Sequence, residues 1–277
     1  MDILDTLNHY EDVKSDIKFV TTSSVRTNII LSLNEGDKDL NTLKNELNLE
    51  SSAALHALKK LKGQNIIIKK ENEYSLSSLG KLYAVKSENL FKSFYTIKKY
   101  EKIWLDHWIN GIPKNLLKEI KCLNNSFLVE STPTDIIRPH SYYTELINRA
   151  HKIKGISPIF YYPYVDIYKN ALKRNANVDL ILTPLILDKM VETAGTKILR
   201  DILSSNDFNL YKIDEDIKIA ITVTENFLSI GLFSTEGLYD ATINLISYDA
   251  GAIKWGNKLF KYYLDKAKQV TLDNLNK

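Results

Sequence analysis

The chain has 277 residues, of which 44% are hydrophobic and 26% are charged, and its formal net charge is +3. This composition excludes a disordered or fibrous chain and predicts a globular protein with room for two domains. A net charge this small does not by itself indicate nucleic-acid binding. A single cysteine, Cys122, excludes an intramolecular disulfide and any site built from several cysteines.

No stretch approaches the ~18 consecutive apolar residues that span a bilayer. The N-terminal residues 1–16 are acidic and lack the apolar segment of a secretory signal. Together with the single cysteine, these features predict a cytoplasmic protein that does not contact membranes.

Residues 3–20 are expected to form a helix or a pair of short helices, and the second helical segment follows Ser23. Asp39 is a candidate cap for a third helix that ends near Leu47. The short turn Asn48–Glu50 then leads into a fourth helix. The third and fourth helices have the lengths and the turn spacing of a helix-turn-helix.

The fourth helix opens a basic stretch, Ser51–Lys70, which contains five lysines and no acidic residue. Leu55, Leu58 and Leu61 recur at spacings of three, which predicts a helix with one apolar stripe. The run Ile66–Ile68 favours a strand directly after it. A helix and strand of this kind are typical of the recognition helix and wing of a DNA-binding winged helix. An ordinary helix and strand with a solvated basic face is the alternative.

Both ends of this helix carry a terminal signal. Ser51 can cap the first turn, because its hydroxyl can accept a hydrogen bond from a free amide. Asn65 stands after the last turn, where asparagine tolerates the left-handed conformation. The polar tip Glu71–Glu73 and the alternating residues Tyr74–Leu76 then predict the second strand of the wing.

The outward face of the helix and the lysines of the wing are the candidate DNA contacts. Short polar side chains can enter a major groove about 12 Å wide and reach base edges, whereas lysines suit phosphates. The candidates are Ser51, Ser52, Ala53, His56, Ala57, Lys59, Lys60, Lys69 and Lys70. A neutral surface histidine is the alternative for His56.

A long amphipathic helix is expected from Ser77 toward Trp104. Such a helix after a wing commonly joins a DNA-binding domain to a dimerisation or sensor part, and a buried helix of a single domain is the alternative. The predicted organisation is a winged helix over residues 1–80, linker and dimerisation helices over 81–120, and an α/β domain over 121–277.

The second half alternates strands with helices and then gives three closely spaced strands. The strands are expected at Phe127–Glu130, Gly155–Phe160, Val178–Thr183, Phe208–Ile213, Ile217–Thr224 and Phe227–Phe233. The helices are expected at Pro133–Ala150, Tyr164–Arg174, Leu185–Leu203 and after Asp249. This order predicts an α/β layer with a mixed sheet.

Several strings of residues resemble a known family. They include Asp16–Phe19, Tyr74–Gly80, Leu228–Phe233, Gly237–Asp240 and Trp255–Tyr263. Through them nearly the whole chain resembles the archaeal, methanogen-associated regulators named after the filamentation and methanogenesis regulator. The first half of the chain is similar to winged helix-turn-helix regulators of the ArsR type.

This resemblance implies a homodimeric transcriptional regulator that binds double-stranded DNA and carries a C-terminal effector domain. The implied fold class is α+β, with a winged helix-turn-helix followed by a sensor domain of phospholipase-D-like topology. The chain departs from the family in its recognition helix, where Ala53, Ala54 and Ala57 replace longer polar residues.

An aromatic cluster after the second strand of the α/β half predicts a site for a small-molecule effector, because open α/β sheets bind ligands at strand ends. Arg138, His140 and Tyr143 could contribute from the preceding helix and hold an acid or a phosphate. The full candidate set is Arg138, His140, Tyr143, Phe160, Tyr161, Tyr162 and Tyr164. Packing of these aromatics in the core is the alternative.

Neither a catalytic nor a metal-binding constellation is expected. The five histidines are scattered, and the chain lacks the His-x-Lys-x4-Asp motif of phospholipase D enzymes and any phosphate-binding loop. We therefore expect no enzymatic activity, no cofactor and no metal. A ligand-independent DNA-binding or partner-binding protein, and a phosphodiesterase-like enzyme, are the alternatives.

Overall fold

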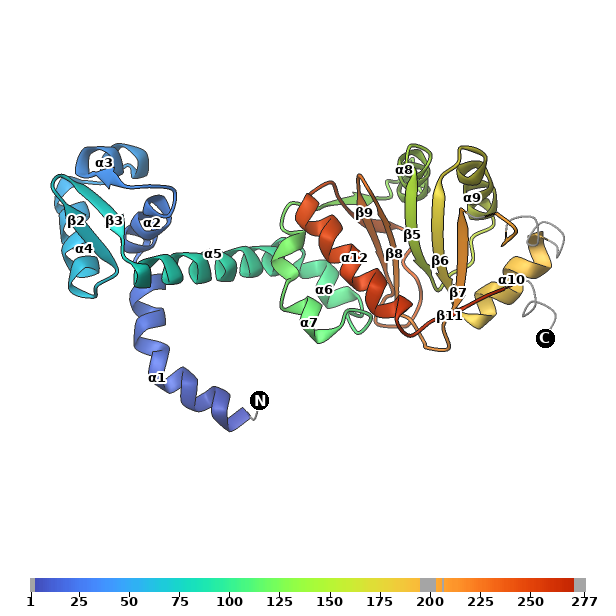
Figure 1. The fold of residues 1–277 in the computed structure, drawn as a ribbon, viewed down its shortest axis with the longest axis horizontal. Coiled ribbons are helices and arrows are strands. Elements are labelled where there is room, and N and C mark those ends of the chain that lie inside the picture. Colours follow the sequence, from blue (N-terminus) through green and yellow to red (C-terminus); the bar gives the residue numbers. More distant parts are fainter. Residues whose placement is uncertain (1–2, 195–202, 206, 272–277) are drawn as a thin grey trace. The chain divides into compact units, whose positions relative to one another are not determined.

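The computed structural model describes residues 3–194, 203–205 and 207–271. It divides into two compact units, residues 1–94 and 95–277. The division falls inside the long helix α5 (Ser78–Lys99), which is drawn in teal in Figure 1.

The N-terminal unit contains four helices before α5 and a small antiparallel sheet with the strand order β1-β3-β2. Its elements are α1 (Ile3–Thr21), α2 (Ser24–Leu33), β1 (Lys38–Asp39), α3 (Leu40–Leu47), α4 (Ser51–Gly63), β2 (Ile67–Lys70) and β3 (Glu73–Leu76). Helices α3 and α4 form the helix-turn-helix, and β2 and β3 form the wing. The predicted winged helix-turn-helix is therefore confirmed.

Local signals fix most ends of these helices. Asp39 caps α3 through a 2.7 Å hydrogen bond that its carboxylate accepts from the amide of Thr42. Asn65 has a φ of 57°, the left-handed conformation expected of it. The expected cap at Ser51 is wrong by one residue. Glu50 takes the extended cap conformation, and its side chain makes no capping hydrogen bond.

The expected apolar stripe of α4 also needs correction. Leu55 is 48% exposed, while Ala54, Ala57, Leu58 and Leu61 are buried. Residues that recur at every third position move gradually around a helix, whereas residues at alternating spacings of three and four stay on one face. The buried face therefore starts at Ala54, and its alanines allow α2 and α3 to approach closely. Ala57 faces this core and cannot contact DNA as expected.

In the C-terminal unit the described residues form an eight-stranded mixed sheet with the order β11-β7-β6-β5-β8-β9-β10-β4. Strands β5, β6 and β7 are parallel, and the other pairs are antiparallel. The strands are β4 (Phe127–Glu130), β5 (Lys152–Ser157), β6 (Asn177–Leu182), β7 (Phe208–Lys212), β8 (Ile219–Thr224), β9 (Leu228–Leu232), β10 (Ile243–Ser247) and β11 (Lys268–Gln269). The predicted α+β class with a mixed sheet is confirmed.

Helices cover both faces of this sheet (Figure 1). The helical elements are α6 (Glu101–Asp106), α7 (Lys114–Leu117), the 3-10 helix η1 (Ile120–Leu123), α8 (Arg138–Ile147), α9 (Pro163–Lys173), α10 (Pro184–Ala194) and α12 (Ala250–Leu264). Asp249 caps α12 as expected, by accepting a 2.7 Å hydrogen bond from the amide of Gly251.

Two apolar cores lie on the opposite faces. One is centred on Trp255 of α12, which is fully buried and donates from its indole N–H to the carbonyl of Leu116 at 3.0 Å. The other lies beneath α8, α9 and α10 and includes Ile147, Ala171 and Leu180.

Some boundaries differ from the expected ones for local reasons. The strand expected at Gly155–Phe160 ends at Ser157, because Pro158 cannot donate to the ladder. The helix expected from Pro133 begins at Arg138, and Pro139 is the proline in its first turn. Strands β1, β10 and β11 were not expected. The C-terminal part of the helix expected at Leu185–Leu203 lies largely outside the described residues.

Candidate DNA-binding helix and ligand chamber

Helix α4 presents a polar row on the side opposite its buried stripe. Ser52, His56 and Lys59, spaced by four and three residues, follow the centre of this outward face, and all three are exposed. Leu55 lies on one flank and Lys60 on the other. Leu55 is a candidate that the sequence analysis missed, because it was assigned to the core. Its exposed apolar side chain could contact a thymine methyl group.

The lysines of this surface have no acidic partner. In the described part of the chain, none of Lys59, Lys60, Lys69 and Lys70 makes a salt bridge. The ammonium of Lys69 lies 5.2 Å from the ring centroid of Tyr74. Apart from the buried Ala57, the candidate DNA-binding residues are all exposed. They are Ser51, Ser52, Ala53, His56, Lys59, Lys60, Lys69 and Lys70.

A second surface of the N-terminal unit is an apolar groove between α1 and α5. Its floor includes Val13, Ile17 and Val20 of α1 and Leu82 and Leu90 of α5. The groove has a volume of about 320 Å³. Leu82 is 65% exposed and forms an apolar patch with its neighbours in the groove, and such patches mark interaction sites.

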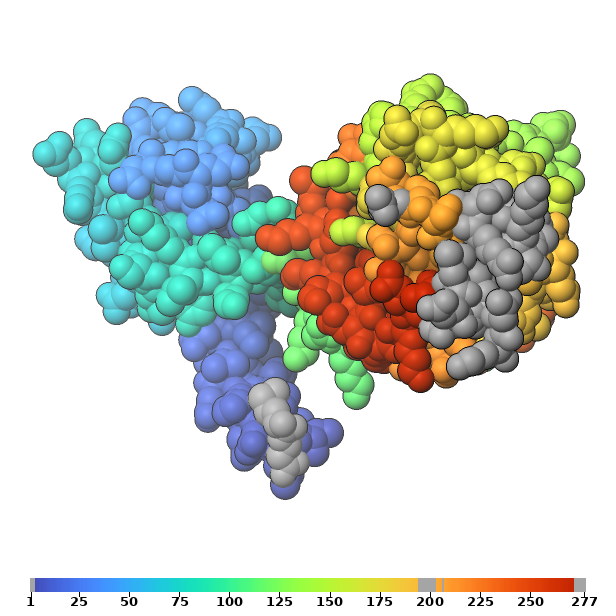
Figure 2. Space-filling model, turned by 45° about the vertical axis from the view of Figure 1, so that its right-hand side comes forward, coloured from blue at the N-terminus to red at the C-terminus, as the bar shows by residue number. Residues whose placement is uncertain are grey.

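The N-terminal half of α1 continues this apolar surface. Ile3, Leu4, Leu7 and Tyr10 are each more than half exposed. Figure 2 shows this part of the helix, in dark blue, standing clear of the rest of the N-terminal unit. An exposed apolar surface of this extent is typical of an interface.

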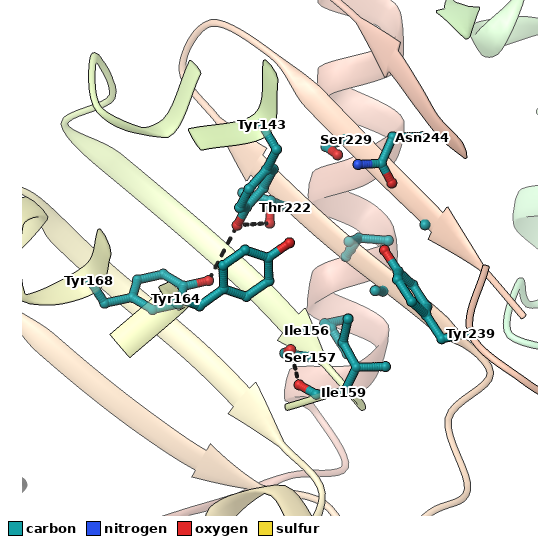
Figure 3. Close-up of a pocket in the computed structure, with 13 residues that line it drawn as sticks. Tyr143, Ile156, Ser157, Ile159, Tyr164, Tyr168, Thr222, Ser229, Tyr239 and Asn244 are labelled. Atoms are coloured by element: carbon teal, nitrogen blue, oxygen red, sulfur yellow. Dashed lines mark hydrogen bonds between the residues drawn. The ribbon is translucent and has the colours of Figure 1, made fainter. Parts of the chain in front are cut away.

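In the C-terminal unit a small chamber lies between the sheet and helices α8 and α9 (Figure 3). Its volume is about 30 Å³, room for about two water molecules. Aromatic, hydroxyl and amide side chains dominate its walls. The lining residues are Tyr143, Ile156, Ser157, Ile159, Tyr164, Tyr168, Ala220, Ile221, Thr222, Ser229, Gly231, Tyr239 and Asn244. We call this cavity the tyrosine chamber.

The strands supply small or polar residues to the chamber because side chains alternate between the faces of a sheet. In β9, Leu228 and Ile230 enter the core under α12, so Ser229 and Gly231 face the chamber. Gly231 is required there, because a Cβ atom on it would lie 2.3 Å from the hydroxyl oxygen of Tyr239.

A hydrogen-bond network holds part of the chamber wall. Tyr143 and Thr222 share a hydrogen bond of 3.0 Å, and the hydroxyls of Tyr143 and Tyr168 lie 3.5 Å apart. Burial raises the pKa of Tyr143 well above its usual value and that of Tyr168 to about 12. These hydroxyls therefore stay protonated and neutral at physiological pH.

An apolar pocket adjoins the chamber and shares Ser157, Ile159, Tyr164 and Tyr168 with it. Phe160, Tyr161 and Tyr164 line this outer pocket together with residues of β6 and α10. The ring of His140 stacks on Tyr161 with centroids 4.5 Å apart, and its Nδ1 is 3.0 Å from the hydroxyl of Tyr164. Burial lowers the pKa of His140, which favours a neutral ring.

The expected ligand residues thus separate into three groups. Tyr143 and Tyr164 line the chamber, Phe160 and Tyr161 line the outer pocket, and His140 supports Tyr164. Arg138 is exposed and Tyr162 is 59% exposed, and neither lines the chamber or the outer pocket. His140 lines neither cavity either, and the expectation that Arg138 and His140 hold an acid or a phosphate stays a prediction.

Thr222, Ser229, Tyr239 and Asn244 complete the chamber and were not expected as site residues. Apolar residues alternate with smaller or polar ones in Leu228–Leu232. This pattern could have identified Ser229, because it places the hydroxyl on the face of the sheet opposite the apolar core. Tyr239 and Asn244 come from a loop and from the unexpected strand β10, so no local pattern pointed to them.

A contact between His107 and Asp240 joins the end of α6 to the segment after β9. His107 is 7% exposed, and its Nε2 lies 3.1 Å from a carboxylate oxygen of Asp240. Among the described residues there is no group of three or more metal-ligating side chains, and no helix long and apolar enough to cross a membrane.

These features define a winged-helix protein with a second, pocket-bearing α/β domain. Two models of the methanogenesis regulatory protein FilR1 match the chain, the N-terminal domain over residues 14–95 and the middle domain over residues 136–266. The chain belongs to this family, as its resemblance implied.

The methanogenesis regulatory protein FilR1 of Methanothrix harundinacea (strain 6Ac) is 28% identical over 269 residues, which cover 96% of this chain. The match covers 60% of that relative, so the chain spans about three fifths of its length. Among solved structures, the archaeal chromatin protein TrmBL2 matches 88% of this chain and 92% of its own, with 15% identity and a TM-score of 0.43. The phospholipase D family member Nuc from Salmonella typhimurium matches 53% of this chain and 99% of its own, with 11% identity and a TM-score of 0.40.

Proposed function

We propose that this chain is a cytoplasmic transcriptional regulator that binds double-stranded DNA as a homodimer and responds to a small molecule. In this proposal residues 1–80 bind DNA, residues 81–120 link and dimerise, and residues 121–277 sense the effector. The observation that carries it is the exposed, unpaired basic surface of α4 and β2, in a unit that has the winged helix-turn-helix arrangement.

The proposed DNA contact places the outward row of α4 in the major groove. Ser52 and His56 can donate or accept hydrogen bonds at base edges, and Leu55 can contact thymine methyl groups. Lys59 and Lys60 would meet phosphates, as would the lysines of β2. An acidic side chain at the centre of this row would repel the DNA backbone.

The test is binding of the purified protein to the DNA upstream of its own gene. His56→Glu should abolish the preference for this DNA over a scrambled duplex, because its carboxylate would face the groove. The matched control is Lys254→Glu on α12, whose exposed side chain lies in the other unit. Equal loss with both variants would contradict the assignment of α4.

The proposed homodimer covers the apolar groove of α1 and α5 with a second copy. The two helices have complementary charge, since Asp5, Asp12 and Asp16 lie on α1 whereas Lys81 and Lys86 lie on α5. The exposed N-terminal half of α1 can lie in the groove of the other copy. A symmetric exchange of this kind buries the same apolar surface in both subunits.

Light scattering coupled to size exclusion tests this interface. Leu82→Glu should give a monomer, because it places an unpaired charge in the groove. Ile136→Glu is the matched control, since Ile136 is 73% exposed on the C-terminal unit. A Leu82→Glu protein that keeps the oligomeric state of the wild type would contradict this surface.

The regulatory step requires that the effector bind one arrangement of the protein better than another. Binding in the C-terminal domain would then change the affinity for DNA. The absence of any ligand effect on stability or DNA affinity would favour the ligand-independent alternative. Hydrolysis of a phosphodiester substrate would favour the enzymatic alternative.

A further inference from the structure

We propose that the tyrosine chamber binds a very small, uncharged molecule with several hydrogen-bonding groups, of about the volume of two water molecules, and that it rejects anions. This inference rests on the proposed sensing role of the C-terminal domain. It deepens that role by naming the chemical class of the effector.

The first observation is the charge of the lining. Every polar side chain in the chamber wall is a hydroxyl or an amide, and no lysine, arginine, aspartate, glutamate or histidine is among them. A carboxylate or phosphate that entered this cavity would lose its hydration without gaining an opposite charge. Such a transfer is strongly unfavourable, whereas a neutral hydroxyl needs only a hydrogen bond.

The second observation is unused hydrogen-bonding capacity. Ser229 is 4% exposed and Asn244 is 5% exposed. Both line the chamber, and neither side chain has a hydrogen-bond partner among the described residues. The hydroxyl of Tyr239 is also without a protein partner there. Buried polar groups are nearly always paired, so three of them around one cavity indicate that water or a ligand completes them.

The third observation is how these groups converge. Figure 3 shows the hydroxyls of Tyr164 and Tyr239 and the amide of Asn244 directed toward the space between them. The groups come from α9, from the segment between β9 and β10, and from β10, so they surround the space from different sides. The hydroxyl of Ser229 offers a donor and two acceptor positions, and the amide of Asn244 offers two donors and an acceptor.

The size of the cavity limits the ligand. A volume of about 30 Å³ holds about two waters, so a ligand that replaces them must be compact. A larger molecule would have to displace Tyr164, one of the residues that the chamber shares with the outer pocket. Suitable probes are formamide and ethylene glycol, and their charged counterparts are formate and glycolate.

Titration calorimetry of the full chain with these four compounds tests the proposal. We expect formamide or ethylene glycol to bind the wild type, and formate and glycolate to show at least tenfold weaker binding. Ser229→Ala and Tyr239→Phe each remove one hydroxyl and should weaken binding of the neutral probe about tenfold. Tyr162→Phe removes a tyrosine hydroxyl outside the chamber and should leave binding unchanged.

Three results would overturn the proposal: no binding of either neutral probe at millimolar concentration, equal or tighter binding of the anions, or unchanged affinity in both chamber variants. Small cosolvents also change protein stability generally, but that effect is the same for all variants and is cancelled by the Tyr162→Phe control. Promoter binding measured on the same samples separates the two claims. If the protein binds the probe but does not prefer its promoter, only the proposed regulatory function is contradicted. If it prefers its promoter but does not bind the probe, only the proposed ligand of the chamber is contradicted.

Discussion

Replacing Lys60 by alanine should weaken DNA binding and flatten its dependence on salt. Lys60 lies exposed on the flank of α4, without an acidic partner among the described residues. Each phosphate that a lysine neutralises contributes about 0.9 to the slope of log K against log salt concentration. A homodimer loses two such lysines in this variant, so the slope should fall by about 1.8.

This change is large enough to measure. Between about 50 and about 200 mM salt, the wild type should lose roughly 12-fold more affinity than Lys60→Ala. This factor is the fourfold ratio of the salt concentrations raised to the difference between the slopes, about 1.8. Fluorescence anisotropy with a labelled upstream duplex gives both slopes. Lys254→Ala on α12 is the control and should keep the slope of the wild type. Equal slopes for the wild type and Lys60→Ala would refute the phosphate contact.

Further predictions concern stability and titration. Gly80→Ala should destabilise the protein by about 1–3 kcal/mol in chemical denaturation, since the added Cβ would lie 2.0 Å from the carbonyl oxygen of Ile66. Gly63→Ala, which meets no atom within 4 Å, should not, and equal losses would contradict the steric cause. Burial alone would raise the pKa of Asp240, but hydrogen bonds from Thr242 and His107 lower it below its usual value of 3.8. Its stabilising contribution is therefore present above pH 3.8 and lost as the pH falls through the lowered pKa, and Asp240→Asn should show a weaker loss of Tm on acidification. An identical acid profile for this variant would contradict that role. In an alkaline absorbance titration the chamber tyrosines should ionise only at about pH 12 or above, or on unfolding, and early ionisation of all sixteen tyrosines would contradict their burial.

Much of the fold could be predicted because its signals are local. Caps such as Asp39 and Asp249, and the left-handed Asn65, depend on hydrogen bonds between near neighbours in sequence. The apolar runs of β6 and β8 identify strands covered on both faces. Strand β10 was missed.

The face of α4 illustrates why a short pattern misleads. Leucine is more hydrophobic than alanine. The pattern therefore placed Leu55 in the core and Ala57 among the DNA contacts. Both assignments are reversed because α2 and α3 pack closely against α4, and a small side chain such as that of Ala57 fits between packed helices. Packing between elements decides such positions.

The candidate ligand site depended even more on long-range structure. The sequence analysis named Tyr143 and Tyr164, which line the chamber from helices that flank the sheet. It could not show that Asn244 and Tyr239 reach the same space, since they are at least 75 residues from both tyrosines in the chain. Nor could it show that Arg138 lines neither cavity.

The most direct test of the account is the preference of the protein for its own upstream DNA over a scrambled duplex of equal length, measured at two salt concentrations. The account predicts that both affinities fall at the higher salt while the preference for the upstream DNA persists, because base contacts from α4 add to the phosphate contacts. Equal binding to both duplexes, lost together as salt is raised, would contradict it and leave only a basic surface.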